Sequence, residues 1–460
     1  MLRPVTLPLW LFVLILLFAG VTFASNFLFP SVRWFFRRRM ERAVARLNRS
    51  LKRPIAPFKL ARRHDMVERL VYDPAVAEAA AAHARRTGEP GAVAFQLARR
   101  YAREIVPAFS ATVYFGFGAR VSRWLSQSWY NVRIGAGAGN PLDAIPPEAA
   151  VVYVMNHRSN MDYVLLTHLV SDDATLSYGV GEWAHFWPVS WLVRAMGAYF
   201  IQRGRRGKLY HRILERYVQM ATESGDPQAV FPEGGLSLDG HTGPARIGIV
   251  SYICAGVKEG GRDVVFVPVA VNYDRVIEDR FLVAAGQSGE RRFRLPWRYI
   301  TGAALRHVGQ RLTGRFHKLG TASVAFGAPV VLASGTDDAA QSPDMLARRL
   351  MAEITAVMPV LPVPLVAHLL IENGAQSRAA LVQAVETTCA DLAQRGIPIP
   401  RREPEVAVAD AVTLLARRGM VEERDGMVTV TSGGEPLVAY YAASIAGHFA
   451  RQENGCGSRA

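Results

Sequence analysis

Hydrophobic and polar positions divide the 460-residue chain into zones of different character, beginning with a long apolar run. Residues 4–32 carry no charge, and residues 7–29 are long enough for a helix to cross a bilayer core of roughly 30 Å. Residues 33–53 then carry nine Lys or Arg against one acidic residue. Since positive flanks stay on the cytoplasmic side, the pattern predicts one transmembrane helix with the body of the protein in the cytoplasm. A cleaved secretory signal is the less favoured alternative.

The rest of the chain alternates between helix-like and strand-like segments. Residues 55–130 are rich in helix formers, with Asp73 and Pro74 as a start signal. Short apolar runs typical of buried strands follow at 151–156, 229–235, 264–273 and 322–332, with helical segments between them. From about Pro359 the pattern is mainly helical again, apart from a hairpin signal at 425–426.

This order predicts an α/β core with a mostly parallel central sheet, flanked by a helical N-terminal region and a mainly helical C-terminal domain. The predicted boundaries are a transmembrane anchor at 1–32, a basic juxtamembrane and helical region at 33–130, a catalytic domain at 131–358 and the C-terminal domain at 359–460.

Composition narrows the class of partner without choosing it. The net charge of +15 favours an anionic partner, such as nucleic acid, anionic lipid or a phosphorylated or acidic molecule. The cysteines at 254, 389 and 456 are far apart, so neither a disulfide framework nor a zinc site is indicated.

Candidate chemistry begins with His157 and Asp162, which follow the apolar run at 151–156. A histidine accepts a proton near neutral pH, and a carboxylate one helical turn away can hold its tautomer. The pair alone, however, favours the simpler interpretation of a surface histidine and a helix-start aspartate.

Three further stretches have the chemistry of a binding site. Arg203, Arg205, Arg206 and Lys208 form a basic, glycine-rich loop before a helix, which suits a phosphate but could equally be a solvated loop. The turn at 233–235, Glu-Gly-Gly, follows a strand, and its glycines permit close approach of a ligand. Pro268 interrupts a strand, which indicates an edge, a bulge or a bend.

The order and spacing of these stretches resemble the four motif blocks of the glycerolipid acyltransferase superfamily. The blocks read NHRSNMD at 156–162, GAYFIQR at 197–203, FPEGG at 231–235 and FVPVAVNYD at 266–274. Within the superfamily, HRSNMDYVLL, KLY after GAYFIQR, PVAVNYDRVIE, VAFGAPV and the flanks ARRYAREIVPAFS and PLVAYYAASIAGHF are most similar to the bacterial membrane-bound glycerol-3-phosphate acyltransferases. This resemblance covers about residues 60–450.

The resemblance implies transfer of a fatty acyl group from a thioester to a hydroxyl. His157 would be the general base and Asp162 its orienting partner. The family's acceptor site corresponds here to Phe200, Arg203, Glu233, Gly234 and Ser237, with Pro268 near the acyl donor. Backbone N–H groups at residues 233–235, including that of Gly235, would stabilise the oxyanion.

One departure from the family concerns the substrate phosphate. The arginines that usually follow the Gly-Gly of the third block, and that are thought to hold the phosphate, are replaced by Leu236 and Leu238. Arg158, Arg203 and Arg246 are the possible substitutes.

The resemblance further implies no metal or cofactor, with acyl-CoA or acyl–acyl carrier protein as co-substrate. The implied partners are the lipid bilayer, this donor, and glycerol 3-phosphate or lysophosphatidate, at the bacterial inner membrane. The nearest alternative is a lysophosphatidate acyltransferase, and dihydroxyacetone phosphate is a third possible acceptor. A membrane-anchored nucleic-acid-binding protein is a weaker alternative, suggested by a winged-helix pattern at 409–430 with Arg417 and Arg418. A catalytically silent scaffold is disfavoured by the intact His157 and Asp162.

Overall fold

The computed structural model describes residues 8–135, 141–181, 187, 189–202, 207–289, 309, 313, 318–334 and 342–450, without the side chains of 19, 21–37, 40 and 141. The chain divides into two compact units, residues 1–54 and 55–460. In the first unit, α1 (Leu9–Ser50) is one continuous helix. Among the described residues, no helix combines the length and the apolar character that a membrane span needs. The transmembrane anchor therefore remains a prediction.

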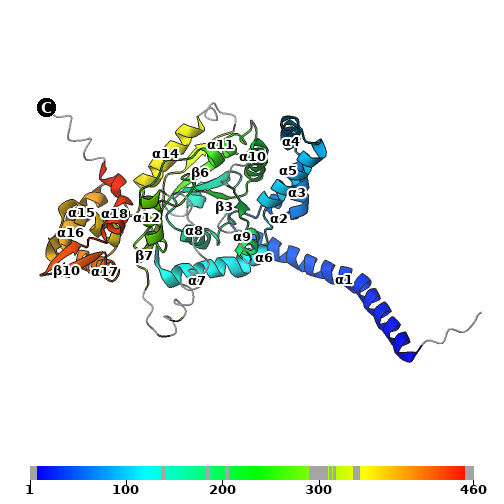
Figure 1. The fold of residues 1–460 in the computed structure, drawn as a ribbon, viewed down its shortest axis with the longest axis horizontal. Coiled ribbons are helices and arrows are strands. Elements are labelled where there is room, and N and C mark those ends of the chain that lie inside the picture. The colour runs from blue at the N-terminus through cyan, green and yellow to red at the C-terminus, as the bar shows by residue number, and fades with distance from the viewer. Residues whose placement is uncertain are drawn as a thin grey trace, which may run out of the picture. The chain divides into compact units, whose positions relative to one another are not determined.

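A mostly parallel sheet lies at the centre of the second unit (Figure 1). Its described strands are β1 (Asn131–Ile134), β2 (Ala150–Met155), β3 (Ser177–Val180), β4 (Tyr199–Phe200), β5 (Gln228–Val230), β6 (Val264–Tyr273), β7 (Thr321–Phe326) and β8 (Val330–Leu332). Their spatial order is β1-β7-β6-β2-β5-β3-β4, and β8 pairs with β6. Strand β6 is antiparallel to β7 and β8, whereas the other described pairs in this sheet are parallel. The predicted α/β core is confirmed.

Alternating side chains of β2 enter two separate cores, because successive residues of a strand point to opposite faces of the sheet. Ala150, Val152 and Val154 pack with α3, α4, α10 and α14. Val151, Tyr153 and Met155 pack on the opposite face with α8 and the C-terminal helices. The result is a sheet between two helical layers, with α10, α11 and α14 on one side and α8 on the other (Figure 1).

The helices between α1 and β6 largely follow the predicted pattern. They are α2 (Pro57–Leu60), α3 (Arg63–Val71), α4 (Pro74–Thr87), α5 (Gly91–Ile105), α6 (Ala111–Val113), the π-helical turn η1 (Tyr114–Gly118), α7 (Ala119–Trp129), α8 (Met161–Val170), α9 (Val189–Ala195), α10 (Lys208–Glu223) and α11 (Gly248–Cys254), with a 3-10 turn at Pro141–Ala144. The start signal at Asp73 works as expected, since its side chain accepts a hydrogen bond from the Ala75 N–H at 3.1 Å and Pro74 follows.

The apolar run at 322–332 forms two strands rather than the single predicted strand. Gly327 separates β7 from β8, and its N–H donates to the carbonyl of Pro268 at 2.9 Å. The N–H and C=O of a strand residue point to the same side, so Pro268 presents its missing donor at the break between β7 and β8. This proline thus lies where β6 changes its antiparallel partner.

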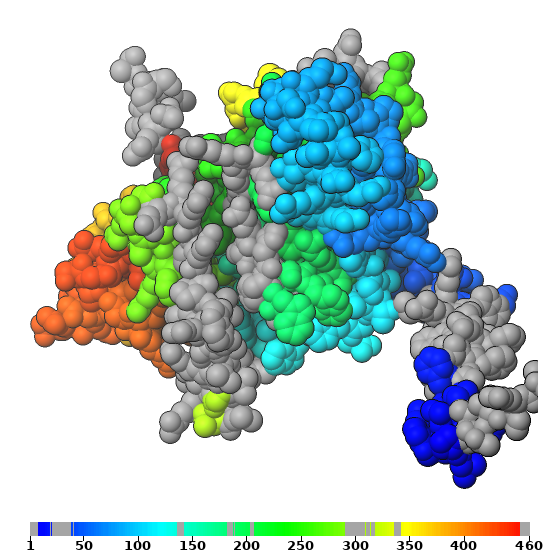
Figure 2. All heavy atoms as spheres, turned by 45° about the vertical axis from the view of Figure 1, so that its right-hand side comes forward, coloured from blue at the N-terminus to red at the C-terminus, as the bar shows by residue number. Residues whose placement is uncertain are grey.

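The C-terminal region packs helices around a small antiparallel sheet. It follows α12 (Asp279–Ser288) and α14 (Pro343–Ala356) and contains α15 (Pro362–Asn373), β9 (Gln376–Ser377), α16 (Arg378–Gln394), α17 (Pro404–Ala416), β10 (Val421–Arg424), β11 (Met427–Val430), α18 (Glu435–Ala443) and a 3-10 turn at Ala446–His448. The predicted hairpin is present, with both Asp425 and Gly426 at positive φ. Figure 2 shows this orange-to-red region and the blue α3–α5 on opposite sides of the second unit.

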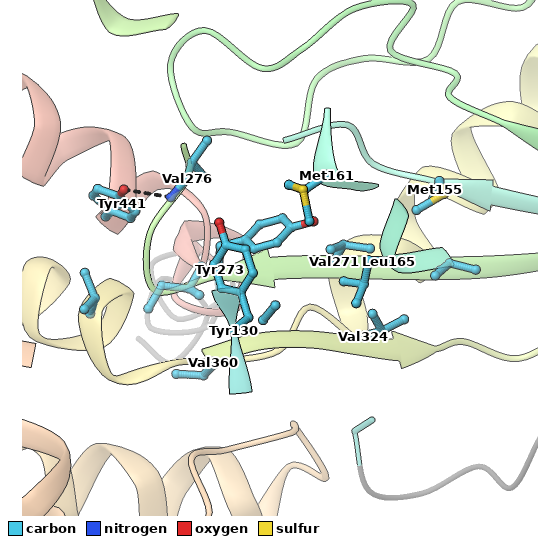
Figure 3. Packing of buried hydrophobic residues seen from close by; sticks show 14 of the residues in the cluster. Tyr130, Met155, Met161, Leu165, Val271, Tyr273, Val276, Val324, Val360 and Tyr441 are labelled. Carbon is cyan, nitrogen blue, oxygen red and sulfur yellow. Dashed lines mark hydrogen bonds between the residues drawn. The ribbon is translucent and has the colours of Figure 1, made fainter. Parts of the chain in front are cut away.

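Buried polar contacts join this region to the loop after β6. The Tyr441 hydroxyl accepts a hydrogen bond from the Val276 N–H at 3.0 Å, drawn as a dashed line in Figure 3. The Nη1 and Nη2 atoms of Arg418 both donate to Asp279, the latter at 2.7 Å. The guanidinium of Arg418 is therefore engaged within the protein.

Candidate active site

The turn that carries His157 begins where the side chain of Asn156 replaces the backbone hydrogen bonds between β2 and β6. The Asn156 amide donates to the Val271 carbonyl at 2.9 Å, and the Val271 N–H donates to Asn156 Oδ1 at 2.8 Å. The backbone after β2 is thereby released from the sheet while its departure point stays fixed. Because β2, β5 and β6 are parallel, the residues that follow them gather at the same carboxyl edge.

His157 and Asp162 form a buried pair at this edge. Their Nδ1 and Oδ2 atoms are 2.9 Å apart, and the residues are 4% and 0% exposed. Since a carboxylate oxygen only accepts, Nδ1 carries the proton, and Nε2 is the nitrogen that can take one up. The imidazole also packs against Phe231, with a ring separation of 4.2 Å, and meets Tyr163 edge-on.

Asp162 is held by more donors than the histidine alone. The backbone N–H groups of Arg158 and Ser159 donate to the same Oδ2 at 2.8 and 3.0 Å, and the Tyr273 hydroxyl donates to Oδ1 at 2.6 Å. Hydrogen bonds to a charged acceptor are about twice as strong as neutral ones. The carboxylate therefore fixes both the loop backbone and the imidazole.

Glu233 brackets the backbone of His157 from the next strand. Its Oε1 accepts from the His157 N–H at 2.9 Å, and its Oε2 accepts from the Gly243 N–H at 3.1 Å. Burial is the main cause that raises the pKa of Glu233 to about 7, against the two N–H donors and Arg158, which lower it. The carbonyl of His157 in turn accepts from the Ser237 N–H at 2.9 Å. The turn after β5 thus holds both backbone groups of the histidine.

Arg158 points away from solvent. It is 2% exposed, its Nη1 donates to the Gly240 carbonyl at 2.5 Å, and its guanidinium lies 5.0 Å from the ring centre of Tyr440 on α18. Its Nε and Nη2 atoms are buried and have no hydrogen-bond partner in the described structure.

Gly234 and Arg246 meet beside the predicted acceptor turn. Gly234 has a φ of 68°, and a Cβ there would lie 2.9 Å from Arg246 Cδ. Arg246 is exposed, and its backbone N–H donates to the Pro232 carbonyl at 2.7 Å. Leu236 and Leu238 are half-buried against the core. Of the three proposed substitutes for the missing arginines, Arg246 is thus an exposed cation beside the Glu-Gly-Gly turn.

The remaining predicted site residues lie at varying distances from the histidine loop. Gly235 lies within the turn after β5, and Ser237 is buried there, with its hydroxyl donating to the His241 carbonyl at 2.8 Å. Phe200 is buried on β4, which β3 and β5 separate from β2, and the guanidinium of Arg194 lies 4.4 Å from its ring centre. Pro268 lies on β6 opposite Val154 of β2. Arg203, with Arg205 and Arg206, lies outside the described residues.

Sequence reasoning missed three residues that hold the loop from a distance. Tyr273 ends β6 and reaches Asp162, as described above. Glu278 accepts from the Ser159 hydroxyl at 2.7 Å and from the Asn160 side chain at 3.1 Å, and burial raises its pKa. Tyr440 comes from α18. The available signal was position along the chain. Tyr273 is the last residue of β6, which is parallel to β2, and Glu278 follows soon after it, whereas Tyr440 gave no such signal.

Two segments of the chain match models of known protein families. Residues 141–272 match a family model described as acyltransferase. This segment of the chain is therefore similar to the acyltransferase family. Residues 311–452 match the model described as the glycerol-3-phosphate acyltransferase C-terminal region. These matches confirm the predicted resemblance, and the histidine loop lies within the segment that matches the acyltransferase model.

The curated relatives are longer proteins. Glycerol-3-phosphate acyltransferase of Pseudomonas putida (strain GB-1) is 30% identical over 308 residues, which cover 65% of this chain and 35% of that protein. The Pseudomonas entomophila (strain L48) protein of the same name is 28% identical over 309 residues, covering 65% and 36%. The chain therefore spans about a third of the length of these relatives. A solved structure, the 1-acyl-sn-glycerophosphate (LPA) acyltransferase of Thermotoga maritima, aligns with this chain at 18% identity and a TM-score of 0.31. The alignment covers 53% of this chain and 78% of that chain.

His157 is the group in this segment that can take up a proton. Among the described residues, no group of His, Cys, Asp or Glu side chains is arranged to hold a metal ion. The imidazole Nε2, backed by a buried carboxylate, is the group that can remove a proton from a hydroxyl.

Proposed function

We propose that the protein transfers a fatty acyl group from a thioester to glycerol 3-phosphate, giving lysophosphatidate. The observation that carries the proposal is the buried His157–Asp162 pair, 2.9 Å apart, at the carboxyl edge of the sheet. Relatives named glycerol-3-phosphate acyltransferase, and the match of residues 311–452 to their C-terminal region, support this acceptor.

In the proposed reaction, Nε2 of His157 takes the proton of the acceptor hydroxyl as its oxygen attacks the thioester carbonyl. The tetrahedral intermediate then expels the thiolate, which recovers the proton from the imidazolium. Asp162 stabilises the imidazolium while it exists, because its negative charge is 2.9 Å away in a dry environment. The thiolate is a good leaving group, so the mechanism needs neither a covalent acyl-enzyme nor a cofactor. Base catalysis of this kind contributes about 10²- to 10⁴-fold in rate.

For the acceptor's phosphate we assign Arg246, and Arg203 by resemblance. Arg246 is exposed and lies beside Gly234, so its charge is accessible at the turn that holds the histidine. The donor is acyl-CoA or acyl–acyl carrier protein, both strongly anionic, and the net charge of +15 suits them.

The same proposal places the enzyme at the bacterial inner membrane, with the catalytic unit on the cytoplasmic side. It rests on the uncharged residues 4–32 and on the nine basic residues that follow within 33–53. We expect the membrane-bound protein to resist carbonate extraction. We also expect protease to digest the second unit only from the cytoplasmic side.

A lysophosphatidate acyltransferase is the second candidate, favoured by Leu236 and Leu238. Both side chains are half-buried and apolar, and they suit the acyl chain that lysophosphatidate has and glycerol 3-phosphate lacks. The acceptors are distinguished by the lipid product. The purified full chain is incubated with labelled acyl-CoA or acyl–acyl carrier protein and is offered glycerol 3-phosphate, lysophosphatidate and dihydroxyacetone phosphate separately.

His157→Ala tests the base directly. The variant should lose acyl transfer while its circular dichroism spectrum and melting temperature stay close to those of the wild type. A folded His157→Ala protein with wild-type turnover would remove the basis of the proposal.

A further inference from the structure

Three segments that are remote in sequence meet behind the histidine loop: Arg158, Gly240 and Tyr440. Nη1 of Arg158 donates to the Gly240 carbonyl at 2.5 Å, and its guanidinium faces the Tyr440 ring at 5.0 Å. Arg158 and Tyr440 are 2% and 1% exposed. Gly240 has a φ of 91°, and a Cβ there would lie 1.9 Å from the Tyr440 carbonyl oxygen. The contact therefore admits no side chain at residue 240.

The charge of Arg158 makes this contact unusual. Its Nε and Nη2 are buried without a partner in the described structure, and so is the Tyr440 hydroxyl. Burying a cation with unpaired donors is unfavourable, so the contacts that Arg158 does make must hold the guanidinium in place. Since the Tyr440 hydroxyl is unpaired, the ring face, through a cation–π interaction, and the Gly240 carbonyl are what hold the guanidinium.

The contact is linked to the catalytic pair by hydrogen bonds. The backbone N–H of Arg158 donates to Asp162 Oδ2, the same oxygen that contacts His157. On the other side, the Gly240 N–H donates to Ser237 Oγ at 3.0 Å, and the Ser237 N–H donates to the His157 carbonyl at 2.9 Å. A displacement of Arg158 or Gly240 would thus move both attachments of the histidine.

We propose that Tyr440 of α18 and Arg158 form a clamp that holds the His157 loop in its reactive geometry. Both are positioning residues, and the inference rests on the proposed acyl transfer. It gives the C-terminal region a specific role in the reaction, through one aromatic ring against one buried cation. It also differs from the sequence hypothesis that Arg158 binds the substrate, because the buried guanidinium is used by the protein itself.

Steady-state kinetics of the full chain in detergent separate the two roles. Tyr440→Leu should lower kcat by about 10- to 100-fold, the loss expected when a reacting group moves by about 1 Å, with the KM of the acceptor unchanged. Tyr440→Phe keeps the ring and should restore kcat. Arg158→Lys, which keeps a charge without the planar guanidinium, should lower kcat similarly, and the double variant Arg158→Lys/Tyr440→Leu should be little worse than either single one.

Arg158→Met covers the case in which Tyr440→Leu does not fold. Methionine removes the buried charge at similar volume, so the melting temperature should hold or rise while kcat falls. Wild-type kcat in Arg158→Met, or multiplicative losses in the double variant, would overturn the clamp. So would a raised acceptor KM in Arg158→Lys with an unaffected Tyr440→Leu, which would make Arg158 a substrate ligand.

A readout independent of turnover separates this inference from the proposed function. The Nδ1–H resonance of ¹⁵N-labelled His157 should report its hydrogen bond to Asp162 in the wild type, and should weaken or exchange faster in Tyr440→Leu but not in Tyr440→Phe. Wild-type protein without any acyl transfer would refute the proposed function, while an unchanged resonance in Tyr440→Leu would refute the clamp.

Discussion

Asp162→Asn is the substitution that best separates charge from scaffold in the site. The Asp162 carboxylate accepts four hydrogen bonds, three at Oδ2 and one from Tyr273 at Oδ1. Asparagine can leave its oxygen at the Oδ2 position, and its NH₂ can donate to the Tyr273 oxygen. The loop should therefore keep its shape, and what is lost is the negative charge 2.9 Å from the imidazole.

The expected loss of activity follows from that charge. Removing one partner of a buried ion pair costs about 3–5 kcal/mol, and here the cost falls on the step in which His157 is protonated. Since about 1.4 kcal/mol is a factor of ten, kcat should fall by about 10²- to 10⁴-fold. Asp162→Ala is the comparison, because it leaves the buried donors unpaired at about 1–3 kcal/mol each and should also lower the melting temperature markedly.

The assay is acyl transfer to each acceptor, with kcat and KM measured beside thermal denaturation of the same preparations. A folded Asp162→Asn protein that retains more than about a tenth of wild-type kcat would refute the reasoning, because the charge would then contribute under 1.4 kcal/mol. Equal melting temperatures for Asp162→Asn and Asp162→Ala would refute the part that concerns the scaffold.

Three further predictions concern stability and substrate binding. Burial raises the pKa of Glu233 from 4.5 to about 7, so the folded state binds this proton more tightly than the unfolded state does. The resulting stabilisation of the fold is fully present below pH 4.5. It is lost, by at most about 3 kcal/mol, as the pH rises through 7. Glu233→Gln should flatten the fall in melting temperature between pH 5 and pH 8, and an unchanged slope would contradict this. Gly240→Ala should lower the free energy of unfolding by about 3 kcal/mol or more, because it combines a positive φ with a clash. The control Gly260→Ala, at a φ of 70° with nothing within 4 Å, should lower it by about 1–2 kcal/mol. Equal losses in the two variants would exclude the clash. Arg246→Gln should raise the KM of the phosphorylated acceptor while leaving that of the acyl donor unchanged, and the opposite pattern would reassign Arg246 to the donor.

Local pattern was enough to predict the central strands and the place of His157 and Asp162 at a strand end. The apolar run at 264–273 is β6 to the residue, and His157 and Asp162 are within hydrogen-bonding distance, as a spacing of five residues across a strand–helix turn allows. Strands β3 and β4, with four and two residues, were too short to show a periodicity.

Long-range contacts were beyond the sequence, for a physical reason. Tyr440 packs on Arg158 from 282 positions away along the chain, and nothing in the helical pattern of α18 distinguishes it from Tyr441, which instead bonds Val276 and contacts Asp279. The orientation of Arg158 was equally hidden, because an arginine in a polar loop is usually exposed and this one is 98% buried. The role of each tyrosine depends on which strand end it meets.

The paired hydrogen bonds of Asn156 have a consequence for the chemical ageing of the protein. Deamidation would turn this side chain into a carboxylate and bring an oxygen against the Val271 carbonyl, where an NH₂ group now donates. A buried aspartate at this position could keep the contact only by holding a proton, at a cost that grows with pH above its usual range. A slow, spontaneous loss of one amide would therefore loosen the anchor of the histidine turn without touching the histidine, and old preparations should lose activity faster at alkaline pH than at neutral pH.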